Sequence, residues 1–151
     1  QKAAELGAAR VVPVRMSRSV VKLTSEEGAR KRERLEKIAR EAMKQCGRAD
    51  ALEILEPVRF QDVLPMFRAE GAMLMPWEET RGFRLGDAHA RTSDARTVGI
   101  LIGPEGGIAP EEAAAACEAG AVPITLGPRI LRAETAAVAA MAVAMHLWGD
   151  L

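Results

Sequence analysis

The stretch that decides the fold is Val98-Gly99-Ile100-Leu101-Ile102-Gly103-Pro104-Glu105-Gly106-Gly107. Its first five residues are apolar or small without alternation, which is typical of a buried strand in a parallel sheet. The glycines that follow let the backbone take positive φ and lie directly against a ligand. Pro110-Glu111-Glu112 then favours the first turn of a helix. The order strand, glycine loop, helix is that of ligand sites in α/β sheets. The loop matches no standard nucleotide-binding pattern, so a purely structural turn is the alternative interpretation.

Strand and helix patterns alternate along the rest of the chain, which predicts an α/β fold. Short apolar runs bounded by turn residues predict strands at 11–14, 52–58, 72–77, 98–102 and 121–126. Helices are expected at 2–6, 25–46, 60–67, 110–119 and 134–148. The polar segment 78–96 is expected to be a mobile connection. We therefore expect a mainly parallel sheet with helices on both faces.

The composition is that of one soluble domain, with 151 residues, 48% of them hydrophobic and 28% charged. Only 3% are aromatic, which argues against recognition of RNA or a cofactor by stacked rings. The two cysteines and two histidines lack metal-ligand spacing, so we expect no metal. No export signal is visible, which predicts a cytoplasmic protein. The sequence opens without Met in the middle of a pattern, and we expect it to be a fragment of a longer protein.

The net charge is zero, but its distribution is uneven. Residues 10–48 hold twelve Lys and Arg against five acidic residues, a net charge of +7, and residues 49–151 carry −7. This asymmetry predicts a face that binds a polyanion such as RNA. Arg18 and Arg48 are predicted phosphate contacts. The alternative is a solvated surface with pairs such as Glu33–Lys37 along a helix.

The last predicted helix, 134–148, is apolar almost all round. A membrane span needs about 20 such residues, and this run is shorter, with Arg132 and Glu134 at its start. A helix of this composition is expected to be buried on every side, in a core or in a subunit interface.

Two motifs in order carry a resemblance to a known family. The first is Leu101–Gly107, and the second is Leu126-Gly127-Pro128-Arg129-Ile130-Leu131-Arg132-Ala133-Glu134-Thr135-Ala136. Together with residues 1–7, 17–22 and 41–48 they resemble the RsmE family of SPOUT methyltransferases. Ala133 stands where that family usually has Thr, which removes one hydroxyl near the site.

The resemblance implies methylation of uridine N3 in 16S ribosomal RNA with S-adenosylmethionine. It also implies that residues 1–151 form one SPOUT methyltransferase domain, with the family's N-terminal RNA-binding barrel and the first strand of the domain outside this chain. A C-terminal deep trefoil knot and a homodimer joined through the C-terminal helix region are further implications. Alternatives are a ribose 2′-O-methyltransferase of the same fold and a non-catalytic RNA-binding or ribosome-assembly module.

The family's motifs also assign roles to residues. The implied cofactor contacts are Leu101, Gly103, Glu105, Gly106, Leu126, Gly127, Ile130 and Leu131, with residues 75–78 as a further wall. Arg132, or else Arg129, would face the uracil carbonyl oxygens. Glu134 is the first candidate for the base and Glu105 the second. The alternatives are that Glu134 only caps the final helix and that Glu105 only holds its loop.

Overall fold

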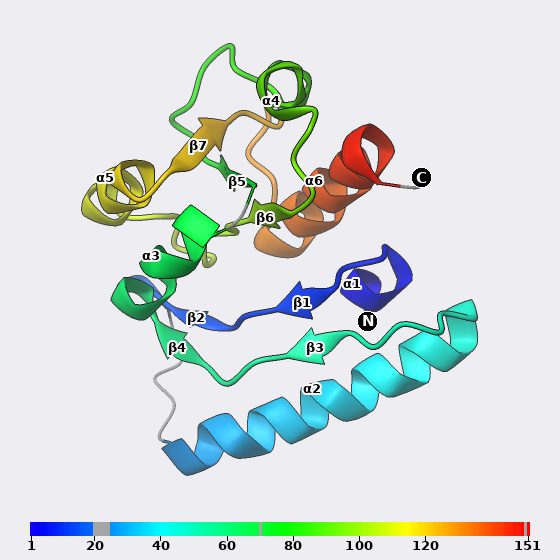
Figure 1. Cartoon of the computed structure of the whole chain (residues 1–151). Helices are drawn as coiled ribbons and strands as arrows, with labels where there is room; N and C mark the ends of the chain where they lie inside the picture. Colours follow the sequence, from blue (N-terminus) through cyan, green and yellow to red (C-terminus); the bar gives the residue numbers. More distant parts are fainter. Residues whose placement is uncertain (20–24, 70, 150) are drawn as a thin grey trace.

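The computed structural model describes residues 1–19, 25–69, 71–149 and 151. Residues 20–22 of the stretch 17–22 that resembles the RsmE family lie outside the described residues. Figure 1 shows the elements in order: α1 (Lys2–Glu5), β1 (Arg10–Val11), β2 (Val14–Arg15), α2 (Ser25–Cys46), β3 (Glu53–Ile54), β4 (Val58–Arg59), α3 (Phe60–Ala69), β5 (Ala72–Pro76), α4 (Leu85–Thr92), β6 (Val98–Ile100), α5 (Pro110–Glu118), β7 (Ala121–Ile124) and α6 (Ala133–Trp148). All strand pairs among the described residues are parallel, which confirms the α/β prediction.

The largest sheet has the strand order β6-β5-β7. Leu74 of the central strand aligns with Ile100 on one side and with Val122 on the other. Leu74 and Met75 are completely buried, which explains why this strand is continuously apolar in sequence. Because the three strands run in the same direction, their carboxyl ends meet at one edge of the sheet.

The two predicted strands near the N-terminus are each split into two short strands. Segment 11–14 becomes β1 and β2, and segment 52–58 becomes β3 and β4. Pro13 and Pro57 lie at the breaks, and proline has no N–H for a sheet ladder. The backbone still connects the two segments, since the Val58 N–H donates to the Pro13 carbonyl at 2.9 Å.

Helix α2 confirms the amphipathic pattern of residues 25–46. Its small residues Ala39 and Ala42 are buried in a cluster with Ala4 of α1 and Ile54 of β3. Some of its basic residues are paired, since Arg32 forms ion pairs with both Glu36 and Glu56. Arg40 also pairs with Glu36, and Lys44 with Glu41. The exposed cations of the helix are Arg30, Lys31, Arg34, Lys37, Arg40 and Lys44.

The prediction of a mobile connection at 78–96 is wrong, because this segment contains helix α4. The Arg84 N–H donates to Asp87 Oδ2 at 2.8 Å at the start of the helix. Leu85 is buried, and Trp148 Nε1 of α6 donates to the Thr92 carbonyl at 2.8 Å. Tertiary contacts with α6 therefore stabilise a helix that is too short to be evident from its own sequence.

Helix α6 is not buried on every side within this chain. Ala140 and Ala144 are buried, whereas Val138 and Val143 are exposed, Val143 by 43%. The helix packs against α4 and β6 with one face, and part of its remaining apolar surface faces outward. Among the described residues, no helix is both long enough and apolar enough to span a membrane.

Leu74→Ala should lower the free energy of unfolding by about 2–5 kcal/mol, because it opens a cavity in the centre of the sheet. Ile38→Ala in α2 is the control and should change stability by less than about 1 kcal/mol, since this side chain is 37% exposed. Urea unfolding followed by circular dichroism measures both values. Equal losses in the two variants would contradict the central position of Leu74.

Candidate active site

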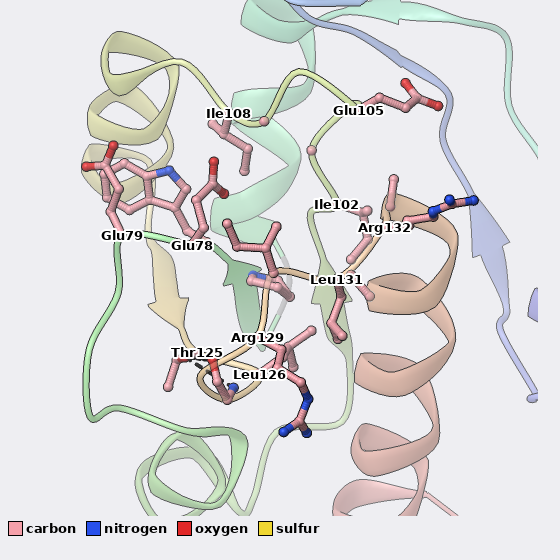
Figure 2. A pocket seen from close by; sticks show the side chains of 18 of the residues that line it. Glu78, Glu79, Ile102, Glu105, Ile108, Thr125, Leu126, Arg129, Leu131 and Arg132 are labelled. Atoms are coloured by element: carbon pink, nitrogen blue, oxygen red, sulfur yellow. Dashed lines mark hydrogen bonds between the residues drawn. The ribbon is translucent and has the colours of Figure 1, made fainter.

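An open pocket of about 1450 Å³ lies at the carboxyl edge of the three-stranded sheet (Figure 2). Three of its walls each follow one strand: residues 76–79 at the end of β5, 102–108 after β6 and 125–134 after β7. Arg81, Gly82 and Arg84 complete the lining together with Ala136. Open α/β sheets bind their ligands at this edge.

The glycine loop after β6 has no room for larger side chains. Gly107 has a φ of +74°, and a Cβ placed there would lie 2.5 Å from Glu78 Oε1. A Cβ on Gly103 would lie 2.7 Å from Ile108 Cγ1. The loop backbone therefore packs closely against Ile108 of the same loop at Gly103 and against Glu78 of the neighbouring wall at Gly107, which only glycine allows.

The loop after β7 is held by its own first residues. The Gly127 N–H donates to Thr125 Oγ1 at 3.2 Å, and the Thr125 N–H donates to the Phe83 carbonyl at 2.8 Å. The second bond joins the segment before α4 to the end of β7. Ile130, near the start of α6, lines the pocket and is 87% exposed, so its side chain is open to contact with a ligand.

The pocket also carries charged groups that have no partner in the part of the chain that the structure describes. Among the described residues, no hydrogen bond or ion pair engages the side chains of Glu105, Arg129, Arg132 or Glu134. In Figure 2 the side chains of Glu105 and Arg132 project toward the same side of the pocket, and that of Arg129 points elsewhere. Glu134 lies in the first turn of α6, which has no side-chain capping hydrogen bond. These groups are therefore available to a ligand.

The structure brings most of the predicted site residues together. The predicted residues that line the pocket are Gly103, Glu105, Gly106, Leu126, Gly127, Ile130, Leu131, Arg132 and Glu134. Leu101 lies outside the lining, buried in the core, and its N–H donates to the Leu74 carbonyl at 2.8 Å. The part of the chain that the structure describes holds no cluster of three or more His, Cys, Asp or Glu suited to a metal ion.

The two predicted phosphate contacts lie in different settings. Arg18 Nη1 donates to the Gly106 carbonyl at 3.1 Å, beside the pocket. Arg48 Nη1 donates to the carbonyls of Ala4 and Ala8, at 3.3 and 2.7 Å, and so ties the end of α2 to the α1 region. These bonds give Arg48 a structural role, and its contact with phosphate stays a prediction, as does that of Arg18.

Sequence reasoning missed the contribution of Arg81, Gly82, Arg84 and Thr125. The first three lie in the segment that follows β5. Because the other walls of the pocket also follow strands, this position could have revealed them. Thr125 was placed within a strand, and the structure ends β7 one residue earlier.

Comparison with known proteins agrees with this geometry. A family model described as an RNA methyltransferase domain matches residues 1–145. The chain belongs to this family of RNA methyltransferases. Ribosomal RNA small subunit methyltransferase E of Bacillus subtilis is 35% identical over 147 residues, which cover 93% of this chain and 57% of that protein. The protein of the same name from Aquifex aeolicus is 34% identical over 97% of this chain and 60% of its own length. The RNA methyltransferase domain thus spans about 60% of the length of these relatives, and the predicted resemblance to the RsmE family is confirmed.

Two solved structures resemble this RNA methyltransferase domain closely. The ribosomal RNA small subunit methyltransferase E from Neisseria gonorrhoeae, bound to S-adenosyl methionine, has a TM-score of 0.85 and 35% identity, over 97% of this chain and 59% of that one. A putative methyltransferase from Legionella pneumophila, in complex with the cofactor SAM, has a TM-score of 0.85 and 34% identity, over 100% of this chain and 60% of that one.

Gly107→Ala should destabilise the domain by about 1–2 kcal/mol, because its φ is positive and the added Cβ meets Glu78. Gly86→Ala in α4 is the control: its Cβ meets nothing within 4 Å, so the domain should keep or gain stability. Thermal and urea unfolding report both. The steric part of the explanation fails if adding Glu78→Ala to Gly107→Ala recovers no stability.

Proposed function

We propose that this domain transfers a methyl group from S-adenosylmethionine to N3 of a uridine in 16S ribosomal RNA. The observation that carries the proposal is the convergence of three strand-end segments on one pocket. A glycine loop lies on one side of it, and Arg132, which has no partner among the described residues, lies on another. Family membership and relatives named as small-subunit ribosomal RNA methyltransferases support the choice of reaction.

The pocket fits such a cofactor. The backbone of Gly103 and Gly106 would lie against it on one side, and that of Leu126, Gly127, Ile130 and Leu131 on the other. Glu105 and Leu101 are also proposed cofactor contacts. Glu105 lines the pocket, and Leu101 lies in the core behind the lining. Trp77 lines the pocket, and its Nε1 is buried with no hydrogen-bond partner among the described residues. A buried donor without a partner is unfavourable, so a ligand acceptor there would stabilise the site.

The main chemical task of the protein concerns the uracil. S-adenosylmethionine supplies a methyl group that its sulfonium makes electrophilic. Uracil N3 carries a proton at neutral pH and is a poor nucleophile until that proton leaves. Glu134 is proposed to accept it, with Glu105 as second candidate. As the proton leaves, negative charge develops on the carbonyl oxygens of the base, and the Arg132 guanidinium would stabilise it.

The target nucleotide must leave its stack to enter the pocket. The exposed cations of α2 are proposed to bind RNA phosphates, together with Arg18 and, at the end of the helix, Arg48. The family's N-terminal RNA-binding barrel, outside this chain, would supply further RNA contacts. A ribosomal RNA substrate would place the protein in the cytoplasm.

A C-terminal deep trefoil knot is part of the same proposal. Strands β6 and β7 lie on opposite sides of β5, yet the loops that follow them line one pocket. The chain after β7 must therefore return across the end of β5, and α6 then packs against β6. This crossing supports the knot.

The decisive experiment combines titration and product analysis. Calorimetry with S-adenosylmethionine should show about one site per chain. A 16S ribosomal RNA transcript, and separately isolated small subunits, are then incubated with the domain and the cofactor, digested and analysed as nucleosides. 3-Methyluridine is the expected product. 2′-O-Methylated nucleoside would favour the ribose methyltransferase, and cofactor binding without methylation of either substrate would favour the non-catalytic module.

Arg132→Gln should lower kcat about 10- to 100-fold, because stabilisation of the developing charge is lost, and leave the Kd for S-adenosylmethionine within about twofold. Arg129→Gln is the matched control, since this arginine lines the same pocket but points elsewhere, and its kcat should fall much less. Single-turnover methylation and calorimetry measure the two quantities. A loss of cofactor affinity with unchanged turnover would refute the role of Arg132.

The exposed apolar face of α6 is proposed as a homodimer interface. Val143→Asp places a charge in that face and should convert the dimer to monomer in analytical ultracentrifugation. Gln61→Asp, on the exposed surface of α3, should leave the dimer intact. A wild-type chain that sediments as a monomer at micromolar concentration would rule out this interface.

A further inference from the structure

The turn at Met16–Ser19, directly after β2, is closed by its own hydrogen bonds. The Met16 N–H donates to Ser19 Oγ at 3.0 Å, and the Ser19 N–H donates to the Met16 carbonyl at 3.1 Å. The Met16 side chain is buried in the main core cluster, with Leu101 and Ile108. The turn is therefore a compact unit anchored to the core rather than an unattached surface loop.

This turn contacts the glycine loop at Gly106 and helix α5 at Glu112, about 90 residues away in sequence. Ser17 donates from its N–H to Glu112 Oε1 at 2.8 Å and from its Oγ to Oε2 at 2.9 Å. Arg18 Nη1 donates to the Gly106 carbonyl at 3.1 Å. A Cβ placed on Gly106 would lie 3.1 Å from Arg18 Cβ, so the turn also packs against the loop backbone.

The glycine loop needs such support. Glycine loses more conformational freedom on ordering than any other residue, and this loop lies on the surface of an open pocket. A ligand that binds a loop already held in shape avoids part of the entropy loss. Hydrogen bonds that involve a charged group, such as those to the Glu112 carboxylate and from the Arg18 guanidinium, are stronger than neutral ones.

We infer that the Met16–Ser19 turn is a positioning element for the cofactor loop, and that Arg18 is its key residue through the Gly106 carbonyl. The identity of the cofactor as S-adenosylmethionine rests on the proposed function; the support of the loop does not. The remaining N–H groups of the guanidinium are compatible with a phosphate contact. A single arginine would then link the basic N-terminal segment to the cofactor loop.

The test replaces Arg18 by Met, which keeps the length of the side chain and removes its donors. Hydrogen–deuterium exchange of the peptide covering 103–108, in the protein without ligand, should become about three- to tenfold faster. The Kd for S-adenosylmethionine should rise by a similar factor. Arg18→Lys should restore part of both losses, because an ammonium can still donate to the carbonyl.

Arg59→Met is the matched control, because Arg59 is an exposed arginine that pairs with Asp62 on the same short segment. It should change neither loop exchange nor cofactor affinity. Glu112→Gln weakens the other anchor and should speed exchange in the same peptide. Unchanged exchange in both Arg18→Met and Glu112→Gln, or equal changes in Arg59→Met, would overturn the inference.

The two proposals fail in different ways. A wild-type chain that does not bind S-adenosylmethionine would contradict the proposed function, while exchange in the ligand-free protein would still decide the role of the turn. Urea unfolding of every variant guards against a general loss of structure. If Arg18→Met does not fold, Arg18→Lys and Glu112→Gln carry the same comparison.

Discussion

Strand β5 is paired along both edges and packed on both faces, and the rest of the structure depends on this position. Its neighbours β6 and β7 run parallel to it, so the three chain segments that leave the sheet start from one edge. Leu74 and Met75 are completely buried, and their side chains pack the sheet against the layers on its two faces. The pocket forms because the segments that follow β5, β6 and β7 all leave the sheet at this edge and surround the same space.

The base of the pocket is the edge of the buried sheet, and its walls are mainly loops without regular secondary structure. Glycine provides the close approach of backbone that a cofactor needs, and the same property leaves the loop easily disordered. The structure compensates with contacts from elsewhere: the Met16–Ser19 turn on one side, and the Thr125–Phe83 bond on the other. The side chains of Glu105, Arg129, Arg132 and Glu134 have no partner among the described residues, so a ligand can contact them without first breaking protein contacts.

Several elements were predictable because their signal is local. The apolar runs 72–77, 98–102 and 121–126 indicate strands, since residues on both faces of these strands are buried or partly buried. The first predicted strands were too long because Pro13 and Pro57 interrupt the pairing. Helix α4 was missed because its eight residues, including Gly86, have weak propensity, and contact with Trp148 supplies the missing stability. For α6 the prediction was burial in a core or in a subunit interface; Ala140 and Ala144 are buried within the chain, and burial of the exposed part in an interface stays a prediction.

The sequence alone indicated the alternation of strands and helices, the glycine loop, the Arg132-containing motif and, through these motifs, the family. Such features depend on neighbours within a few residues, where propensity and spacing act directly. Only the tertiary structure decided that Arg18 meets Gly106, that segment 81–84 joins the pocket and that Leu101 lies behind it. These contacts join residues far apart in the chain, and no local periodicity encodes them, because they arise from the packing of parallel strands around β5.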